Sequence, residues 1–334
     1  MNKKISIKKI AELSGVSVAT VSRVINNNGR FSEETRKKVL KVIRENNYQT
    51  NNVAKSLRMH KSYTVGILVP DITNPFFSNT VQIIEKNLFE KGYSTIICNT
   101  ARSRDKELEY VKILESKIVD GLIVISGFKT FDRKNLPDDL PVICIDRSPA
   151  DSTIAFVGSD HYEGAVMATE FLLAETENLA IVKHDEQSSS GSERVRGFEE
   201  TLFKEKVEKF GSLIVSNGSQ NDQQKQIKKF LQDEMNGSKQ PLGVFALSDT
   251  LAANILLVAH DLSIKVPKQL KIMGFDDSPI ASYCSPQLTT IRQNEILLAK
   301  EASGKLIKLM NGENLARDEI VKKIPVQLIV RGTT

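Results

Sequence analysis

The sequence of 334 residues has no tryptophan, three cysteines and four histidines. The cysteines Cys98, Cys144 and Cys284 stand singly in apolar runs, without a C-x-x-C pair. This spacing argues against a disulfide framework or a zinc module and predicts a reducing, cytoplasmic setting. No run of 18 apolar residues occurs, and the lysines near the start lead into no apolar signal core. We therefore expect a soluble protein without a membrane partner.

Signatures of several enzyme classes are also missing. The four histidines lack the spacing of metal ligands, and the sequence contains no G-x-x-x-x-G-K-[ST], H-E-x-x-H or G-x-S-x-G motif and no G-x-G-x-x-G after a strand. An acid–base pair of Asp146 and Asp276 is the remaining enzymatic alternative. We therefore expect a protein that is not an enzyme and holds neither a metal nor a cofactor.

Charge is divided unevenly along the chain. Residues 1–62 hold 14 lysines and arginines against four glutamates and no aspartate, a balance of +10, whereas the remaining residues hold 32 basic and 37 acidic side chains, a balance of −5. A short basic segment on a mildly acidic body is typical of a nucleic-acid-binding module joined to a second function. Charge alone leaves a basic tail or a solvated helix face as alternatives.

The basic segment has the apolar periodicity of a folded domain. Apolar and small residues recur at helical spacing from Ile7 to Ser14 and from Val21 to Ile25, and a third helix is expected from Glu33 to Asn46. Ser17 is suited to cap the second helix, and Gly15 tolerates the positive φ of a tight turn between the first two. This arrangement predicts a helix-turn-helix.

In a helix-turn-helix, the N-terminal end of the second helix enters the major groove. Val18 and Ala19 are expected to meet thymine methyl groups there, and Arg23 to reach a guanine edge or a phosphate. Hydroxyl and amide side chains of the same region are expected to hold phosphates and fix the register: Ser6, Ser17, Thr20, Ser22 and Asn26. Capping or solvent contact is the alternative for each hydroxyl, and for Ser17 capping is at least equally favoured.

The stretch from Ile7 to Asn26, IKKIAELSGVSVATVSRVIN, resembles the DNA-reading head of the lactose/galactose repressor (LacI/GalR) family. The resemblance implies a hinge helix further on, capped by Asn51, with Ala54 as its small residue, although Thr50 replaces the usual proline. Leu57 from each subunit then wedges into the minor groove at the operator centre; a core role in the linker is the alternative. So short a helix is expected to be coil in the free protein and ordered only on DNA.

From residue 63 onward, short apolar runs rich in β-branched residues alternate with amphipathic segments, which predicts parallel sheets covered on both faces. About ten strands favour two lobes over one open sheet. The body also resembles that family and the periplasmic sugar-binding proteins that share its fold. The matching pieces are Val69–Phe77, Ile145–Arg147, Arg194–Phe198, Gly274–Asp277, Leu288–Gln293 and Leu328–Arg331.

The expected fold class is an N-terminal all-α helix-turn-helix head plus an α/β periplasmic-binding-protein-like core of two doubly wound lobes. The expected domains are a DNA-binding head at 1–50, a hinge at 51–62 and an effector-binding and dimerisation core at 63–334. Lobe 1 is expected to comprise about 63–160 and 291–320, and lobe 2 about 161–290 and 321–334.

Ligands of open α/β sheets lie beyond the carboxyl ends of the strands, where this sequence places polar residues. Sugars need apolar faces for their C–H surfaces and forked polar groups for their hydroxyls. The candidate effector-binding residues are Asp71, Asn74, Phe76, Phe77, Asp146, Arg147, Ser190, Arg194, Ser248, Asp276 and Gln293. A strand-end turn is the alternative for each polar residue taken singly, and a core role for the phenylalanines. Two arginines could also hold a phosphate or a carboxylate.

These expectations describe a repressor of a carbohydrate-utilisation operon. Its partners are a palindromic operator, a second copy of the chain and a small sugar or sugar phosphate bound between the lobes. The sequence leaves open which sugar binds, whether that sugar releases or promotes DNA binding, and which operator is read. A protein corepressor is not indicated.

Overall fold

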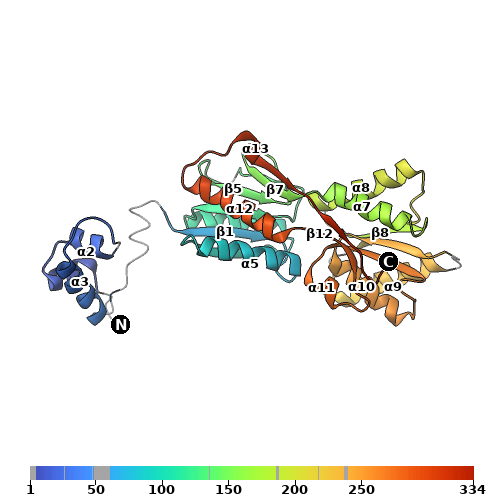
Figure 1. Cartoon of the computed structure of the whole chain (residues 1–334), viewed down its shortest axis with the longest axis horizontal. Helices are drawn as coiled ribbons and strands as arrows, with labels where there is room; N and C mark the ends of the chain where they lie inside the picture. The colour runs from blue at the N-terminus through green and yellow to red at the C-terminus, as the bar shows by residue number, and fades with distance from the viewer. Residues whose placement is uncertain are drawn as a thin grey trace. The chain divides into compact units, whose positions relative to one another are not determined.

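The structure is a computed structural model of the chain, and it describes residues 5–25, 27–46, 48, 61–134, 136–185, 188–216, 218–236 and 240–334. The chain divides into two compact units, Met1–Ser62 and Tyr63–Thr334 (Figure 1). Four of the expected DNA-contacting residues lie outside the described residues: Asn26, Asn51, Ala54 and Leu57. Among the described residues, no helix has the length and apolar character needed to cross a membrane.

The described residues of the first unit form the helices α1 (Ile7–Ser14), α2 (Val18–Ile25) and α3 (Glu33–Glu45). Ser6 caps α1 by accepting a hydrogen bond from the Lys9 amide, and Gly15 ends it at a φ of 62°. A small core holds the helices together: Ile10, Ala11, Val21, Val24 and Val39. The predicted helix-turn-helix is confirmed.

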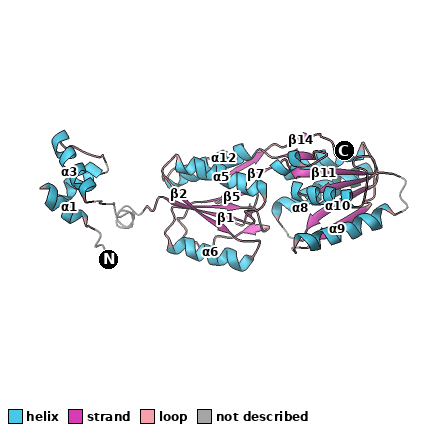
Figure 2. Cartoon of the chain, turned by 90° about the horizontal axis from the view of Figure 1, so that it is seen from below, coloured by secondary structure: helices cyan, strands magenta, loops and turns pink. Residues whose placement is uncertain are grey.

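Lobe 1 of the second unit is a six-stranded sheet in the order β13-β7-β5-β3-β1-β2, with all neighbouring pairs parallel. Its strands are β1 (Thr64–Val69), β2 (Ser94–Asn99), β3 (Gly121–Ile125), β5 (Val142–Ile145), β7 (Ala155–Ser159) and β13 (Val321–Ile324). Helices α5 (Pro75–Phe89) and α12 (Glu295–Met310) cover one face, and α6 (Arg104–Ser116) covers the other (Figure 2). Three short elements complete the lobe: β4 (Thr130–Phe131), β6 (Ser148–Pro149) and α13 (Arg317–Ile320).

Lobe 2 is a second six-stranded sheet in the order β14-β12-β11-β10-β8-β9. Its strands are β8 (Leu179–His184), β9 (Gly211–Val215), β10 (Leu242–Ala246), β11 (Leu270–Asp276), β12 (Thr289–Arg292) and the antiparallel β14 (Gln327–Ile329). One apolar cluster joins the sheet to α7 (His161–Leu173) and α8 (Ser189–Glu205). Another joins it to α9 (Gln220–Met235), α10 (Asp249–Asp261) and α11 (Pro279–Tyr283).

The chain crosses between the two sheets three times, after β7, after β12 and after β13. The expected lobe boundaries near residues 291 and 321 were therefore wrong by one short element each. β12 belongs to lobe 2, because it pairs with β11, so the crossing follows Arg292. β13 belongs to lobe 1, because it pairs with β7 from Val321 to Ile324, so the last crossing follows residue 324.

Candidate functional site

A cavity of about 530 Å³ lies between the two lobes, beyond the carboxyl ends of several parallel strands. Lobe 1 contributes Asn74, Phe76, Phe77, Arg102, Ser126, Lys129 and Asp146 to its wall. Lobe 2 contributes Lys183, His184, Leu247, Ser248, Asp276 and much of the first turns of α8, including Ser190 and Arg194. This volume lies in the usual range of small-molecule sites.

The cavity brings together most of the residues expected at the effector site. The expected residues on its wall are Asn74, Phe76, Phe77, Asp146, Ser190, Arg194, Ser248 and Asp276. Gln293 stands behind the wall, where its Nε2 donates to Asp276 Oδ1 at 2.6 Å. Asp71 and Arg147 do not line the cavity.

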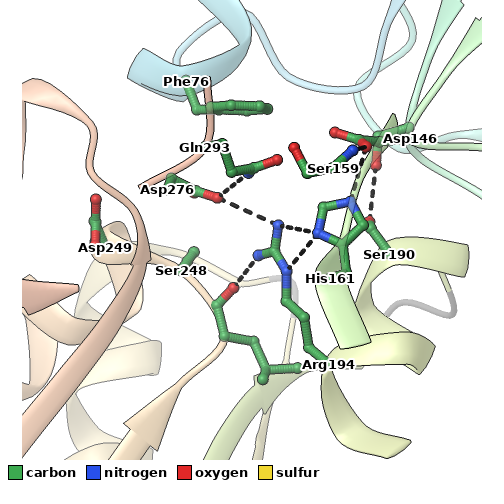
Figure 3. A network of polar contacts seen from close by, with 12 residues as sticks. Phe76, Asp146, Ser159, His161, Ser190, Arg194, Ser248, Asp249, Asp276 and Gln293 are labelled. Atoms are coloured by element: carbon green, nitrogen blue, oxygen red, sulfur yellow. Dashed lines mark hydrogen bonds and ion pairs between the residues drawn. The ribbon is translucent and has the colours of Figure 1, made fainter. Parts of the chain in front are cut away.

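A polar network links residues of the cavity wall to groups behind them (Figure 3). Arg194 is its centre: its Nη2 donates to Asp276 Oδ1 at 3.3 Å, and its Nη1 donates to the Leu247 carbonyl oxygen. Its guanidinium lies over the Phe275 ring, 3.7 Å from the centroid. His161 connects Arg194 to Asp146, with its Nε2 2.8 Å from Asp146 Oδ1. The network therefore joins the strand ends of both lobes.

The two carboxylates of the network enter the cavity at strand ends with unusual backbone geometry. Asp146 follows β5 at a φ of 52°, and Asp276 ends β11 at a φ of 117°. Non-glycine residues seldom adopt positive φ, and aspartate is one of the types that does so more often. The backbone thus turns where each strand ends, and the carboxylate faces the gap between the lobes.

Burial controls the electrostatics of these groups. It raises the pKa of Asp276 to about 6, although Arg194 and Gln293 stabilise its ionised form. Burial and then the charge of Asp276 raise the pKa of Asp249 well above its usual value; Asp249 accepts hydrogen bonds from Ser278 and Thr290. Burial lowers the pKa of His184 to about 4.

The aromatic part of the site sits at the start of α5. Asn74 caps this helix by accepting from the Phe76 amide at 2.9 Å. Phe76 and Phe77 meet edge to face with their centroids 5.5 Å apart, and Figure 3 shows the Phe76 ring beside Gln293 at the network. Both phenylalanines line the cavity and also belong to the core of lobe 1. A role in the core and a place at the site therefore do not exclude each other.

The structure separates Arg147 from the site. Its guanidinium pairs with the buried Glu107 through two contacts of 2.6 and 3.0 Å, donates to the Thr130 carbonyl oxygen and lies over the Phe131 ring. Two parallel hydrogen bonds to a buried carboxylate stabilise the Arg147 guanidinium more than contact with solvent in the cavity would. Asp71 instead accepts hydrogen bonds from the Thr73 amide and hydroxyl, which is the strand-end turn considered as its alternative.

Sequence reasoning missed several groups at the site: Arg102, Ser126, Lys129, His161, Lys183, His184 and Ser188. His161 follows the carboxyl end of β7, so the strand-end rule could have found it. It also missed Ser189, whose hydroxyl donates to the Asp146 carbonyl oxygen and accepts from the Ser148 amide, and thereby joins the lobes beside the cavity. Among the described residues, no group of three or more His, Cys, Asp or Glu side chains could hold a metal ion.

In the first unit, α2 presents most of its predicted DNA-contacting residues to solvent. Ser17, Val18, Ala19 and Arg23 are exposed, whereas Thr20 and Ser22 are half-buried. Ser17 also accepts a hydrogen bond from the Thr20 amide at 3.1 Å, so it caps α2, which was the alternative role considered for this residue. A basic helix-turn-helix with an exposed second helix suits the major groove.

A helix-turn-helix joined to a two-lobed core with an interlobe cavity defines the class of ligand-responsive DNA-binding regulators. Residues 6–51 match the bacterial regulatory proteins of the lacI family, and residues 168–334 match a periplasmic binding protein-like domain. The ribose operon repressor of Halalkalibacterium halodurans is 33% identical over 333 residues, which cover 98% of this chain and 97% of that repressor. The transcriptional repressor PurR of Vibrio parahaemolyticus is 30% identical over 98% of both chains. The chain therefore belongs to the lacI family.

Solved structures agree with this assignment. The lac repressor dimer bound to operator and the anti-inducer ONPF covers 99% of this chain and 99% of its own, with a TM-score of 0.84 at 24% identity, which shows the shared fold. A periplasmic binding protein/LacI transcriptional regulator from Alkaliphilus metalliredigens, complexed with D-xylulofuranose, covers 81% of this chain and 99% of its own, with a TM-score of 0.71 at 28% identity. As a family member, this protein is a DNA-binding transcriptional regulator.

Proposed function

We propose that this regulator represses a carbohydrate-utilisation operon in the cytoplasm and that a small neutral sugar, a pentose first, binds the interlobe cavity and changes its affinity for the operator. The observation that carries the proposal is the network of Asp146, Arg194 and Asp276 beneath Phe76. Carboxylates accept from adjacent hydroxyls, the guanidinium donates to them, and an aromatic ring covers a sugar's C–H face.

The relatives support a pentose. The 33% identical relative is a ribose operon repressor, and the Alkaliphilus regulator holds D-xylulofuranose. A regulator from Enterococcus faecium with bound ribose is 26% identical and has a TM-score of 0.68. A sugar phosphate is the second candidate, because Lys129 and Lys183 line the same cavity and neither makes an ion pair with a described residue.

On DNA, we propose a homodimer that places one α2 helix in each half of a palindromic operator. Val18, Ala19 and Arg23 would meet base edges, and the hydroxyls of Ser6, Ser17, Thr20 and Ser22 would meet phosphates. The contacts proposed for Asn26, Asn51, Ala54 and Leu57 rest on the family resemblance. Effector binding controls the DNA complex only through its different affinities for the DNA-competent and DNA-incompetent arrangements of the lobes.

The test combines DNA selection with sugar titration. The purified protein selects an operator from fragments of its own genome, and the affinity for that operator is then measured by fluorescence anisotropy with D-ribose, D-xylulose, hexoses and their phosphates. We expect one pentose to change operator affinity at least about tenfold, in a direction that the titration determines. No sequence preference, or no response to any sugar, refutes the proposal. Turnover of a sugar in the same mixture would contradict our proposal that the protein has no enzymatic activity.

A further inference from the structure

His161 stands between the two lobes without lining the cavity. It is the first residue of α7 in lobe 2, and its side chain is 5% exposed. Its Nε2 lies 2.8 Å from Asp146 Oδ1, and its Nδ1 lies 3.3 Å from both Nε and Nη2 of Arg194. Figure 3 shows the imidazole ring between the carboxylate and the guanidinium.

These contacts permit one arrangement of protons. A guanidinium has donors and no acceptor, so His161 Nδ1 must accept and cannot carry a proton. The ring proton is therefore on Nε2, where it is donated to Asp146. The pKa of His161 is lowered chiefly by burial and also by Arg194, against the opposing charges of Asp146 and Asp160. The imidazole is thus neutral, with a fixed tautomer.

This arrangement decides what Asp146 and Arg194 can offer a ligand. Asp146 Oδ1 is occupied by His161 and by the Ser159 amide at 2.8 Å, whereas its other carboxylate oxygen makes no hydrogen bond with a described residue. Arg194 donates from Nε and Nη2 to His161 and from Nη2 to Asp276. Its Nη1 donates one N–H to the Leu247 carbonyl oxygen, and the second N–H of Nη1 remains. Because both residues line the cavity, one carboxylate oxygen of Asp146 and one N–H of Arg194 remain for a ligand there.

We propose that His161 is a positioning residue of the ligand site, which fixes Asp146 of lobe 1 and Arg194 of lobe 2 in orientation and position for contact with the hydroxyls of a neutral sugar. The proposal rests on the proposed function only for the identity of the ligand. A histidine that merely filled the core would contribute to stability and leave sugar affinity unchanged.

Two substitutions separate the two bonds of the ring. In His161→Gln the amide nitrogen reaches the place of Nε2 and can donate to Asp146, whereas in His161→Asn the amide oxygen takes the place of Nδ1 and can accept from Arg194. Each variant keeps one bond and loses the other. The group that loses its bond must then be ordered again when the sugar binds, so we expect an affinity loss of about 10- to 100-fold, as for residues that orient the ligands of a metal. Glu163→Gln, an exposed position on the same helix, is the matched control.

The first measurement is the affinity for D-ribose by calorimetry, together with the thermal midpoint of each variant. We expect both His161 variants to bind D-ribose about 10- to 100-fold more weakly, with the control unchanged. Wild-type affinity in both His161 variants overturns the proposal, whatever their thermal midpoints. Failure of the wild-type protein to bind any sugar refutes the proposed function instead, and the second measurement then decides on His161.

The second measurement needs neither ligand nor a His161 variant. Nitrogen-15 NMR of histidine-labelled wild-type protein reports the tautomer of each ring, and single His→Gln variants at positions 60, 184 and 260 assign the remaining signal to His161. We expect its Nε2 to be protonated and its Nδ1 bare, with a pKa lowered from its ordinary value by burial. A proton on Nδ1, or titration near the ordinary pKa of about 6.5, overturns the proposal.

Discussion

Gly197 packs α8 directly against α7, and replacing it with alanine tests the packing of the helix that carries Arg194. A Cβ at residue 197 would lie 2.6 Å from the Tyr162 carbonyl oxygen and 2.8 Å from the Ala165 Cβ. The first neighbour is a backbone atom inside a helix, so it cannot rotate away as a side chain can. The two helices would have to separate by roughly 0.5–1 Å to restore van der Waals contact.

Two effects of Gly197→Ala oppose each other. Alanine in a helix interior is favoured over glycine by about 1 kcal/mol. Overpacking a dense interface costs about 1–3 kcal/mol, and two contacts below 3 Å place this site at the upper end. We therefore expect a net loss of about 2 kcal/mol in the free energy of unfolding, which lowers the thermal midpoint by about 4–8 °C. Sugar affinity should fall as well, because α8 also carries Ser190 and Arg194.

Gly304→Ala is the matched control in α12, because a Cβ there meets no heavy atom within 4 Å. It should keep the propensity gain and raise the thermal midpoint by a few degrees, about 1 kcal/mol in free energy. Thermal unfolding followed by circular dichroism compares the three proteins. A Gly197→Ala variant as stable as wild type, or stabilised like Gly304→Ala, would refute the close crossing of α7 and α8.

Three further predictions concern single side chains. Arg147→Met should cost about 1.5–3 kcal/mol of stability, because the buried Glu107 loses its hydrogen bonds from Arg147 and keeps its ion pair with the exposed Arg104. Sugar affinity should change less than about threefold, and adding Glu107→Leu should restore stability. If the variant lost sugar affinity without losing stability, Arg147 would have to contact the ligand, and the reasoning would be wrong. Because the pKa of Asp276 is raised to about 6, its ionised carboxylate prevails only above that pH, so calorimetric affinity should be constant above pH 7 and fall toward tenfold per pH unit below 6; a flat profile contradicts this. Ser17→Ala should destabilise the helix-turn-helix head by about 1 kcal/mol, because α2 loses its cap, and should lower the thermal midpoint of the head. An unchanged midpoint would show that the cap does not stabilise the head.

The elements that sequence reasoning placed well are those with strong periodicity and clear end signals. The three head helices combine apolar stripes with Ser6, Gly15 and Ser32 at their ends, and the structure uses each of these residues as a cap. The core strands could be recognised in the sequence as nearly continuous apolar runs, because both faces of their sheets are covered by helices. Since ligands of parallel sheets lie beyond the carboxyl ends of the strands, the sequence alone predicts that Asp146 and Asp276 lie at one cavity.

The errors have physical causes that a linear pattern does not contain. Arg147 left the expected site because Glu107, far away in the sequence, is buried beneath it, and side-chain partners across such separations leave no periodic signal. β13 escaped notice because three of its four residues, Val321 to Lys323, are exposed at the edge of the sheet and carry two lysines. Edge strands often carry such charges, so their sequences resemble loops.

The last strands of the chain have a consequence for synthesis. β13 occupies one edge of the first sheet and β14 one edge of the second, although both come from residues 321–329. On the ribosome, the described head helices can fold from local contacts early, whereas neither sheet can acquire its edge strand until residues 321–329 have been translated. The helix-turn-helix of a nascent chain can therefore fold well before the effector-binding core. A product truncated before residue 321 would keep the helix-turn-helix but lack an edge strand in both sheets.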